Sequence, residues 1–205
     1  AFTYFLNQGV GQVACQEKHM GSRAVVVVCR DEDAARKRFG VVGGEAGIVY
    51  TRTGRRFFED RAVEQTLLQT VRDAATAAGW WETFKSDWFC LDCELMPWSA
   101  KAQDLLKHQY AAVGSASRAA LADVVSSVEQ AHDRSGQANP ELLDQLLTSH
   151  RERLKMAAQY VDAYRRYCWP VRSVSDLKLA PFHLLASEGH VHVDKDHVWH
   201  METIA

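Results

Sequence analysis

The sequence lacks long apolar runs and has little excess of charge of either sign. No stretch approaches the roughly 18 apolar residues that a membrane-spanning helix needs, and the first residues form neither a basic region nor an apolar signal segment. The 205 residues carry 24 Lys and Arg against 26 Asp and Glu, which gives a net charge of -2. We therefore expect no membrane association, and any polyanion must be bound by a local cluster of basic residues.

Cysteine is scarce and odd in number, and most of the cysteines lie inside apolar runs. This use is typical of buried free thiols in a reducing compartment, so we predict a cytoplasmic protein without disulfides. Because 47% of the residues are hydrophobic and 24% are charged, a folded domain is expected and disorder should not dominate. The cysteines are Cys15, Cys29, Cys90, Cys93 and Cys168.

Short runs of β-branched and aromatic residues, bounded by Gly, Asp or charged turns, predict strands near both ends of the sequence. One helix is predicted between them, from Arg61 to Ala78, with Asp60 as its N-cap and Gly79 as its stop. The expected strands are Gly9–Cys15, Arg23–Arg30, Gly47–Arg52, Trp88–Leu95, Lys178–Ala186 and His190–Asp194.

A long helical block follows the fourth expected strand. From about Ser99 to Tyr167 apolar residues recur every three or four positions, with breaks expected at Gly114 and Gly136. Asn139–Pro140 resembles a cap and a first-turn proline, so a new helix should begin there, after an exposed loop at 135–139.

These patterns predict an α+β fold. We expect a mixed or antiparallel sheet domain built from residues 1–98 and 171–205, with a helical module inserted at 99–170. The chain opens without Met and stops within a patterned segment, which we interpret as a piece of a longer polypeptide.

A lysine that could act as a nucleophile lies just before the run of four valines. Lys18 should lie in a glycine-containing loop between two strands, where loss of water and nearby cations would leave its amine unprotonated for attack on a phosphate. Gly21 would let the backbone approach a nucleotide, and Arg23 could reach a ribose or phosphate. The structural alternative is a surface lysine in a hairpin.

Three further segments could complete a nucleotide site. Arg52 and Arg55 belong to a basic turn that could bind phosphate. Asp92 and Glu94 share one face of a strand because they are two residues apart, so this apolar strand should meet a cation, a metal or a ribose hydroxyl there. Phe182 could stack on a base, although it would also fit a protein core.

Two other functions remain open. The C-terminal histidines could form a zinc site with Asp194 or Asp196, although they would also fit a polar hairpin. Alternatively, basic residues of the last helix could serve a scaffold that binds RNA or a partner without catalysis, although they would also fit a solvated helix face. The histidines are His183, His190, His192, His197 and His200, and the basic residues are Arg151, Arg153, Lys155, Arg165 and Arg166.

Taken in order, these segments resemble the covalent nucleotidyltransferase superfamily of DNA ligases, RNA ligases and capping enzymes. The similarity is most specific to the C-terminal ligase, or adenylyltransferase, domain of bacterial polynucleotide kinase-phosphatase, and it spans nearly the whole chain. It is carried by EKHMGSRAVVVVCR, YTRTGRRFF, DCELMPWSAKAQ, YCWPV and LKLAPFHLLASEG. The resemblance makes Lys18 the nucleophile and matches Arg23, Arg52, Glu94 and Phe182 to residues that bind the nucleotide. From the residues themselves we add Glu17 and Arg55 to the nucleotide site, and we expect Asp92 and Glu94 to hold a metal, directly or through water.

The resemblance also implies an activity and partners. Lys18 would form a lysyl-AMP adduct with ATP and Mg²⁺ or Mn²⁺, and the AMP would pass to an RNA 5′-phosphate before a 3′-hydroxyl displaces it. The partners implied are RNA ends, a subunit that methylates the 3′-terminal ribose 2′-hydroxyl, and a second copy of the full-length protein.

One motif of the superfamily is imitated without being matched. Glu188–Gly189–His190 resembles the start of a later Glu-Gly-x-Val-x-Lys strand, but it follows Phe182 too closely and has no lysine at the required place. We therefore expect a strand turn there, and we expect this chain to lack the last two motifs and to be incomplete as a ligase by itself.

Overall fold

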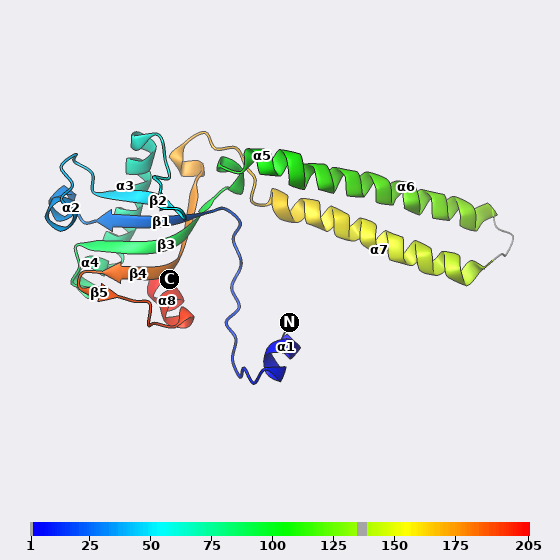
Figure 1. The fold of residues 1–205 in the computed structure, drawn as a ribbon, viewed down its shortest axis with the longest axis horizontal. Helices are drawn as coiled ribbons and strands as arrows, with labels where there is room; N and C mark the ends of the chain where they lie inside the picture. The colour runs from blue at the N-terminus through cyan, green and yellow to red at the C-terminus, as the bar shows by residue number, and fades with distance from the viewer. Residues whose placement is uncertain (1, 135–138) are drawn as a thin grey trace. The chain divides into compact units, whose positions relative to one another are not determined.

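The computed structural model describes residues 2–134 and 139–205, which divide into two compact units (Figure 1). One unit contains the chain up to Met96 together with Val171–Ala205, and the other contains Pro97–Pro170.

Within the described residues, five strands form one antiparallel sheet in the order β2-β1-β3-β4-β5. The α+β class and an antiparallel sheet, both predicted from the sequence, are confirmed. The strands are β1 (Ser22–Cys29), β2 (Gly47–Thr51), β3 (Trp88–Met96), β4 (Lys178–Ser187) and β5 (His190–Val191).

One face of the sheet forms the core of the first unit. Alternate residues of β1, among them Val26 and Val28, are buried against α3 (Arg61–Ala77), which lies across this face (Figure 1). Asp60 caps α3 by accepting from the N–H of Ala62, as predicted. Phe89, Leu91, Cys93, Leu95 and Leu184 extend the same core along β3 and β4.

The first unit also contains shorter helices, and the sequence patterns did not predict α2 or α8. Asp31 caps α2 and Asp196 caps α8, so two aspartates start helices that are too short for a clear apolar period. Helix α8 packs against β4. The elements are α1 (Phe2–Asn7), α2 (Glu32–Phe39), α4 (Trp80–Thr83), η3 (Val174–Asp176) and α8 (His197–Ile204).

The predicted strand at Gly9–Cys15 is wrong, because residues 10–20 have no regular secondary structure. Both edges of β1 are already paired, with β2 and with β3, so a preceding strand finds no free edge beside it. The strand expected at His190–Asp194 is shortened to two residues, and Gly189 forms the predicted turn before it with a φ of 70°.

The second unit is a helical hairpin in which α6 and α7 run side by side (Figure 1). The break expected at Gly114 is wrong, because this residue lies inside α6 at a close approach to α7. A β-carbon there would lie 2.7 Å from Cγ2 of Val161. The elements are η1 (Trp98–Ala100), α5 (Gln103–Leu105), η2 (Leu106–Ala111), α6 (Ala112–Arg134) and α7 (Pro140–Arg165).

Helix α7 starts at Pro140 as predicted, although the side chain of Asn139 makes no capping hydrogen bond. The loop expected at 135–139 and the break at Gly136 fall on positions 135–138, outside the described residues. Among the helices that are described, none is both long and apolar enough to cross a membrane.

Candidate functional site

The segment that carries Lys18 is held to the sheet through Gly21. The N–H of Gly21 donates a 2.8 Å hydrogen bond to Oε1 of Glu94 on β3. A β-carbon at Gly21 would lie 2.3 Å from the carbonyl oxygen of Leu95, so the contact requires glycine. The glycine that was predicted to approach a nucleotide therefore approaches β3. Lys18 itself is exposed, which differs from the expected loss of water, because no strand precedes the segment and covers it.

Arg23 and Asp92 form an ion pair between β1 and β3. Nε of Arg23 donates to Oδ1 of Asp92 at 2.8 Å, and Nη2 donates to Oδ2. The Asp92 side chain is 1% exposed and the Arg23 side chain 49%, and the hydrogen bond with this carboxylate raises the pKa of the guanidinium. The guanidinium is therefore the cation that this buried carboxylate meets, and a metal contact of Asp92 stays a prediction. The contact of Arg23 with a nucleotide stays a prediction.

Phe182 reaches the carboxylate face of the sheet through a β-bulge. In the β3–β4 register Asp92 pairs with His183 and Cys93 pairs with Pro181, which leaves Phe182 without a partner. Pro181 lines a cavity on the α3 side, whereas Phe182 shares a cavity with Glu94. The extra residue has therefore turned the ring away from the core.

A cavity of about 300 Å³ brings together residues that are far apart in the sequence. Lys18 comes from the segment before β1, Glu94 from β3 and Phe182 from β4. An amine, a carboxylate and an aromatic ring thus border one space, and this is the combination that a bound nucleotide would need. The cavity is lined by Gln16, Glu17, Lys18, His19, Glu94 and Phe182.

The basic turn after β2 lies outside the lining of the Lys18 cavity. Thr51 pairs with Ala24, so Arg52 follows β2 at the end of the sheet where β1 begins, but neither Arg52 nor Arg55 lines the cavity. Both side chains are exposed, and their contact with phosphate stays a prediction.

Arg56, the third arginine of the turn, is held by the fold. It donates to the fully buried carboxylate of Glu64 at 2.7 Å and also to Glu45, while Glu64 accepts from the N–H of Val49. This arginine therefore anchors the turn to α3 and β2.

Sequence reasoning missed the contacts of Gln16. Its Oε1 lies 2.8 Å from Nε2 of His197, the first residue of α8, and Nδ1 of His197 lies 3.3 Å from Nε2 of His183 on β4. Burial and the nearby His200 lower the pKa of His183. The spacing contains a signal for Gln16, because residues two apart on an extended segment lie on the same side, and Gln16 is two residues before Lys18.

The histidine-rich end of the chain does not converge on a metal. His192 contacts the hydroxyl of Ser187 at 3.0 Å, whereas His183 contacts His197. Among the residues that the structure describes, no group of three or more His, Cys, Asp or Glu is arranged to hold a metal ion. The histidines pack against each other and against aromatic rings instead, so this part of the chain gives no support to the zinc module.

Basic residues also gather in the helical unit. Arg118 of α6 and Arg151 and Lys155 of α7 border one groove, which is also lined by small residues such as Ala119. Arg151 is paired with Glu129 at 2.7 Å, so part of the positive charge is neutralised within the hairpin. Of the basic cluster predicted on the last helix of this unit, only Arg151 and Lys155 line the groove.

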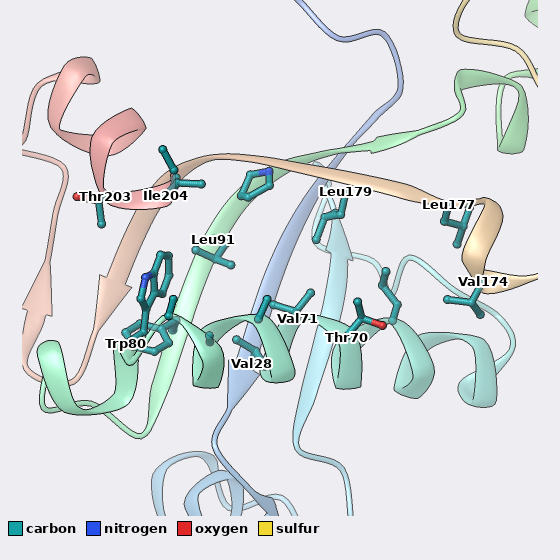
Figure 2. A pocket seen from close by; sticks show the side chains of 17 residues that line it. Val28, Thr70, Val71, Trp80, Leu91, Val174, Leu177, Leu179, Thr203 and Ile204 are labelled. Atoms are coloured by element: carbon teal, nitrogen blue, oxygen red, sulfur yellow. The ribbon is translucent and has the colours of Figure 1, made fainter.

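A separate apolar cavity of about 350 Å³ lies between α3, the sheet and α8 (Figure 2). Figure 2 shows Val71 of α3, Leu91 of β3, Leu179 of β4 and Ile204 of α8 around it. The side chains that line it carry no charge, so this cavity offers no charged group to pair with a phosphate.

Sequence comparison identifies the family. The family described as PNKP adenylyltransferase domain, ligase domain, matches residues 1–205. The chain belongs to this family. The PNKP ligase family is the one that the sequence motifs resembled, so the predicted family is confirmed. No curated protein matches the chain in sequence.

A solved structure has a similar fold. A chain of the structure described as "Structure of Pnkp1/Rnl/Hen1 complex" matches with a TM-score of 0.50 and 15% identity. The match covers 91% of this chain and 50% of that chain, so this chain spans about half the length of its structural relative. At this identity the likeness concerns the fold alone.

Proposed function

We propose that this chain is the adenylyltransferase domain of an ATP-dependent RNA ligase, and that Lys18 carries AMP as a covalent lysyl adduct. One observation supports this most strongly: Lys18, Glu94 and Phe182 come from separate segments and line the same cavity. The family match, which covers the whole chain, supports the use of ATP.

The first step joins the lysine to AMP. Nζ of Lys18, after losing a proton, attacks the α-phosphorus of ATP and forms a P–N bond. The bond between the α-phosphorus and the bridging oxygen breaks, and pyrophosphate leaves with the electron pair. Phe182 would stack on the adenine, while Glu94, already fixed by the N–H of Gly21, would face the ribose or a cation.

The later steps transfer AMP to RNA. An oxygen of the RNA 5′-phosphate attacks the adenylyl phosphorus, which breaks the P–N bond and returns Lys18 to its amine. The 3′-hydroxyl of the other RNA end then attacks the activated 5′-phosphate, and AMP leaves as the phosphodiester forms. Arg52 and Arg55 stand exposed at the end of the sheet where β1 begins, where guanidinium groups can bind RNA phosphates.

The donor set of the cavity suits a hard divalent cation. Glu17 and Glu94 bring carboxylate oxygens to the same space as Lys18, and Mg²⁺ and Mn²⁺ prefer such oxygens together with phosphate oxygens. Glu17 and Glu94 would hold the ion, which when bound neutralises charge on the phosphates. Both oxygens of Asp92 already accept from Arg23, so Asp92 would contact the ion through water.

The partners follow from the same proposal. We expect RNA ends as substrates and a methyltransferase subunit that modifies the 3′-terminal ribose, in keeping with the complex in which the structural relative was solved. A bacterial, cytoplasmic setting and a homodimer of the full-length protein complete the proposal.

The decisive experiment is the transfer of label from ATP. The intact protein is incubated with ATP labelled at the α-phosphate and with Mg²⁺ or Mn²⁺, and protein-bound label is measured after denaturation. We expect an acid-labile adduct that disappears in Lys18→Ala. Lys37→Ala, which changes an exposed lysine of α2, is the matched control and should label like the wild type.

Two outcomes would contradict the proposal. If Lys18→Ala retained the label, a residue other than Lys18 would be the nucleophile. No label in the intact wild-type protein would leave the non-catalytic scaffold that binds RNA or a partner.

A further inference from the structure

Gln16 is tied to two histidines at the border of the Lys18 cavity. Its Oε1 contacts Nε2 of His197 at 2.8 Å, and His197 contacts His183 at 3.3 Å through its other ring nitrogen. His183 directly follows Phe182 on β4. The glutamine is therefore attached on the side of the cavity where the aromatic ring lies.

The atoms in contact fix which groups donate. Burial lowers the pKa of His183, which favours the neutral imidazole with a single N–H. With the carbonyl oxygen of Gln16 against Nε2 of His197, that nitrogen donates and Nδ1 of the same ring accepts from Nε2–H of His183. The amide nitrogen of Gln16 is left to donate on another side of the carboxamide.

We propose that Gln16 is a nucleotide-binding residue whose amide nitrogen donates a hydrogen bond to an acceptor on the edge of the purine, and that His197 and His183 are positioning residues for it. This inference rests on the proposed function, which puts the base on Phe182. Gln16 lines the same cavity as Phe182 and Lys18, so a base stacked on the ring would present its edge to the carboxamide.

The chemistry suits a neutral donor. The adenine ring carries nitrogen acceptors along its edges, and a carboxamide held by a second hydrogen bond loses little freedom when it meets one of them. Loss of one such hydrogen bond should weaken nucleotide binding by about fivefold to tenfold.

Binding of AMP tests the hydrogen bond from Gln16 separately from adenylylation of Lys18, because AMP has no pyrophosphate to release. Calorimetric titration of the intact protein compares the wild type with Gln16→Ala, Gln16→Glu and a control, Gln12→Ala. Gln12 is an exposed glutamine of the same segment that does not line the cavity. We expect Gln16→Ala to bind AMP about tenfold more weakly and Gln12→Ala to bind it like the wild type.

Gln16→Glu separates the two contacts of the glutamine. A carboxylate still accepts from His197 but cannot donate to the base, so this variant should lose at least as much AMP affinity as Gln16→Ala. AMP binding that is unchanged in Gln16→Glu would overturn the proposal.

The positioning role is tested by a double-mutant cycle. His197→Ala should weaken AMP binding about threefold to tenfold in the wild type and have no further effect in Gln16→Ala, because it acts through that side chain. His197→Gln, which keeps a donor at a similar reach, should restore most of the affinity. Equal losses from His197→Ala in both backgrounds would refute the positioning role.

The outcome also separates this inference from the proposed function. If the wild type forms the Lys18 adduct and Gln16→Ala binds AMP like the control, the inference fails while the ligase stands. If the wild type forms no adduct with ATP, the proposed function fails and the inference fails with it.

Discussion

The ion pair between Arg23 and Asp92 predicts an unequal response to the loss of either partner. Asp92 is 1% exposed, whereas half of the Arg23 side chain remains in contact with water. Replacing Arg23 by Met leaves a buried carboxylate without a cation, which costs about 3–5 kcal/mol when a pair is fully buried. Because water can reach the vacated half, we expect a loss of about 2 kcal/mol.

The reverse substitution should cost less. Asp92→Asn keeps an oxygen that accepts from Nε of Arg23, and the half-exposed guanidinium is hydrated in place of its lost partner, so the loss should stay near or below about 1 kcal/mol. Thermal unfolding followed by circular dichroism measures both variants. For Arg23→Met we expect a fall in Tm of roughly 4–8 °C.

The combined variant completes this test. Arg23→Met together with Asp92→Leu removes both charges and should recover most of the stability lost in Arg23→Met alone. If Asp92→Asn proved as destabilising as Arg23→Met, or if the combined variant were less stable than either, the assignment of the burial cost to Asp92 would be refuted.

Three further predictions concern the site and the thiols. Glu94→Gln should keep the bond to Gly21 but lower the rate of adduct formation about 10- to 100-fold, with Tm unchanged; a wild-type rate of labelling would remove Glu94 from the site. Gly21→Ala should displace the segment that carries Lys18 and lower the labelling rate about 100-fold, and normal labelling would contradict the close approach to β3. Burial raises the pKa of Cys29 to about 11, so this thiol stays protonated at pH 8 and should react with Ellman's reagent far more slowly than the exposed Cys15; equal rates would refute its burial.

The sequence was most informative where the local pattern alone determines the structure. The valine run of β1, the capped helix α3 and the start of α7 at Pro140 follow from side-chain period and from residues with defined backbone preferences. The shared face of Asp92 and Glu94 also follows from strand period, although a pattern in one strand cannot show that Arg23 of the next strand will meet Asp92.

The sequence was least informative where the structure of a segment depends on the distant residues that it contacts. Residues 10–15 have a strand-like composition, but both edges of β1 are already paired. Gly114 lies inside α6, where Val161 of the facing helix leaves no room for a β-carbon. The contact between Gln16 and His197 spans 181 positions in the sequence, and no local period can reveal it.

The bulge in β4 gives one residue an orientation that depends on the length of the strand. Phe182 faces the Lys18 cavity because it is one residue more than β3 can pair with. Exchange of the ring for another aromatic would keep the number of residues between Pro181 and His183, whereas deletion of this single position would remove the bulge there. Any variation in this part of the protein is therefore constrained in residue number more tightly than in residue type.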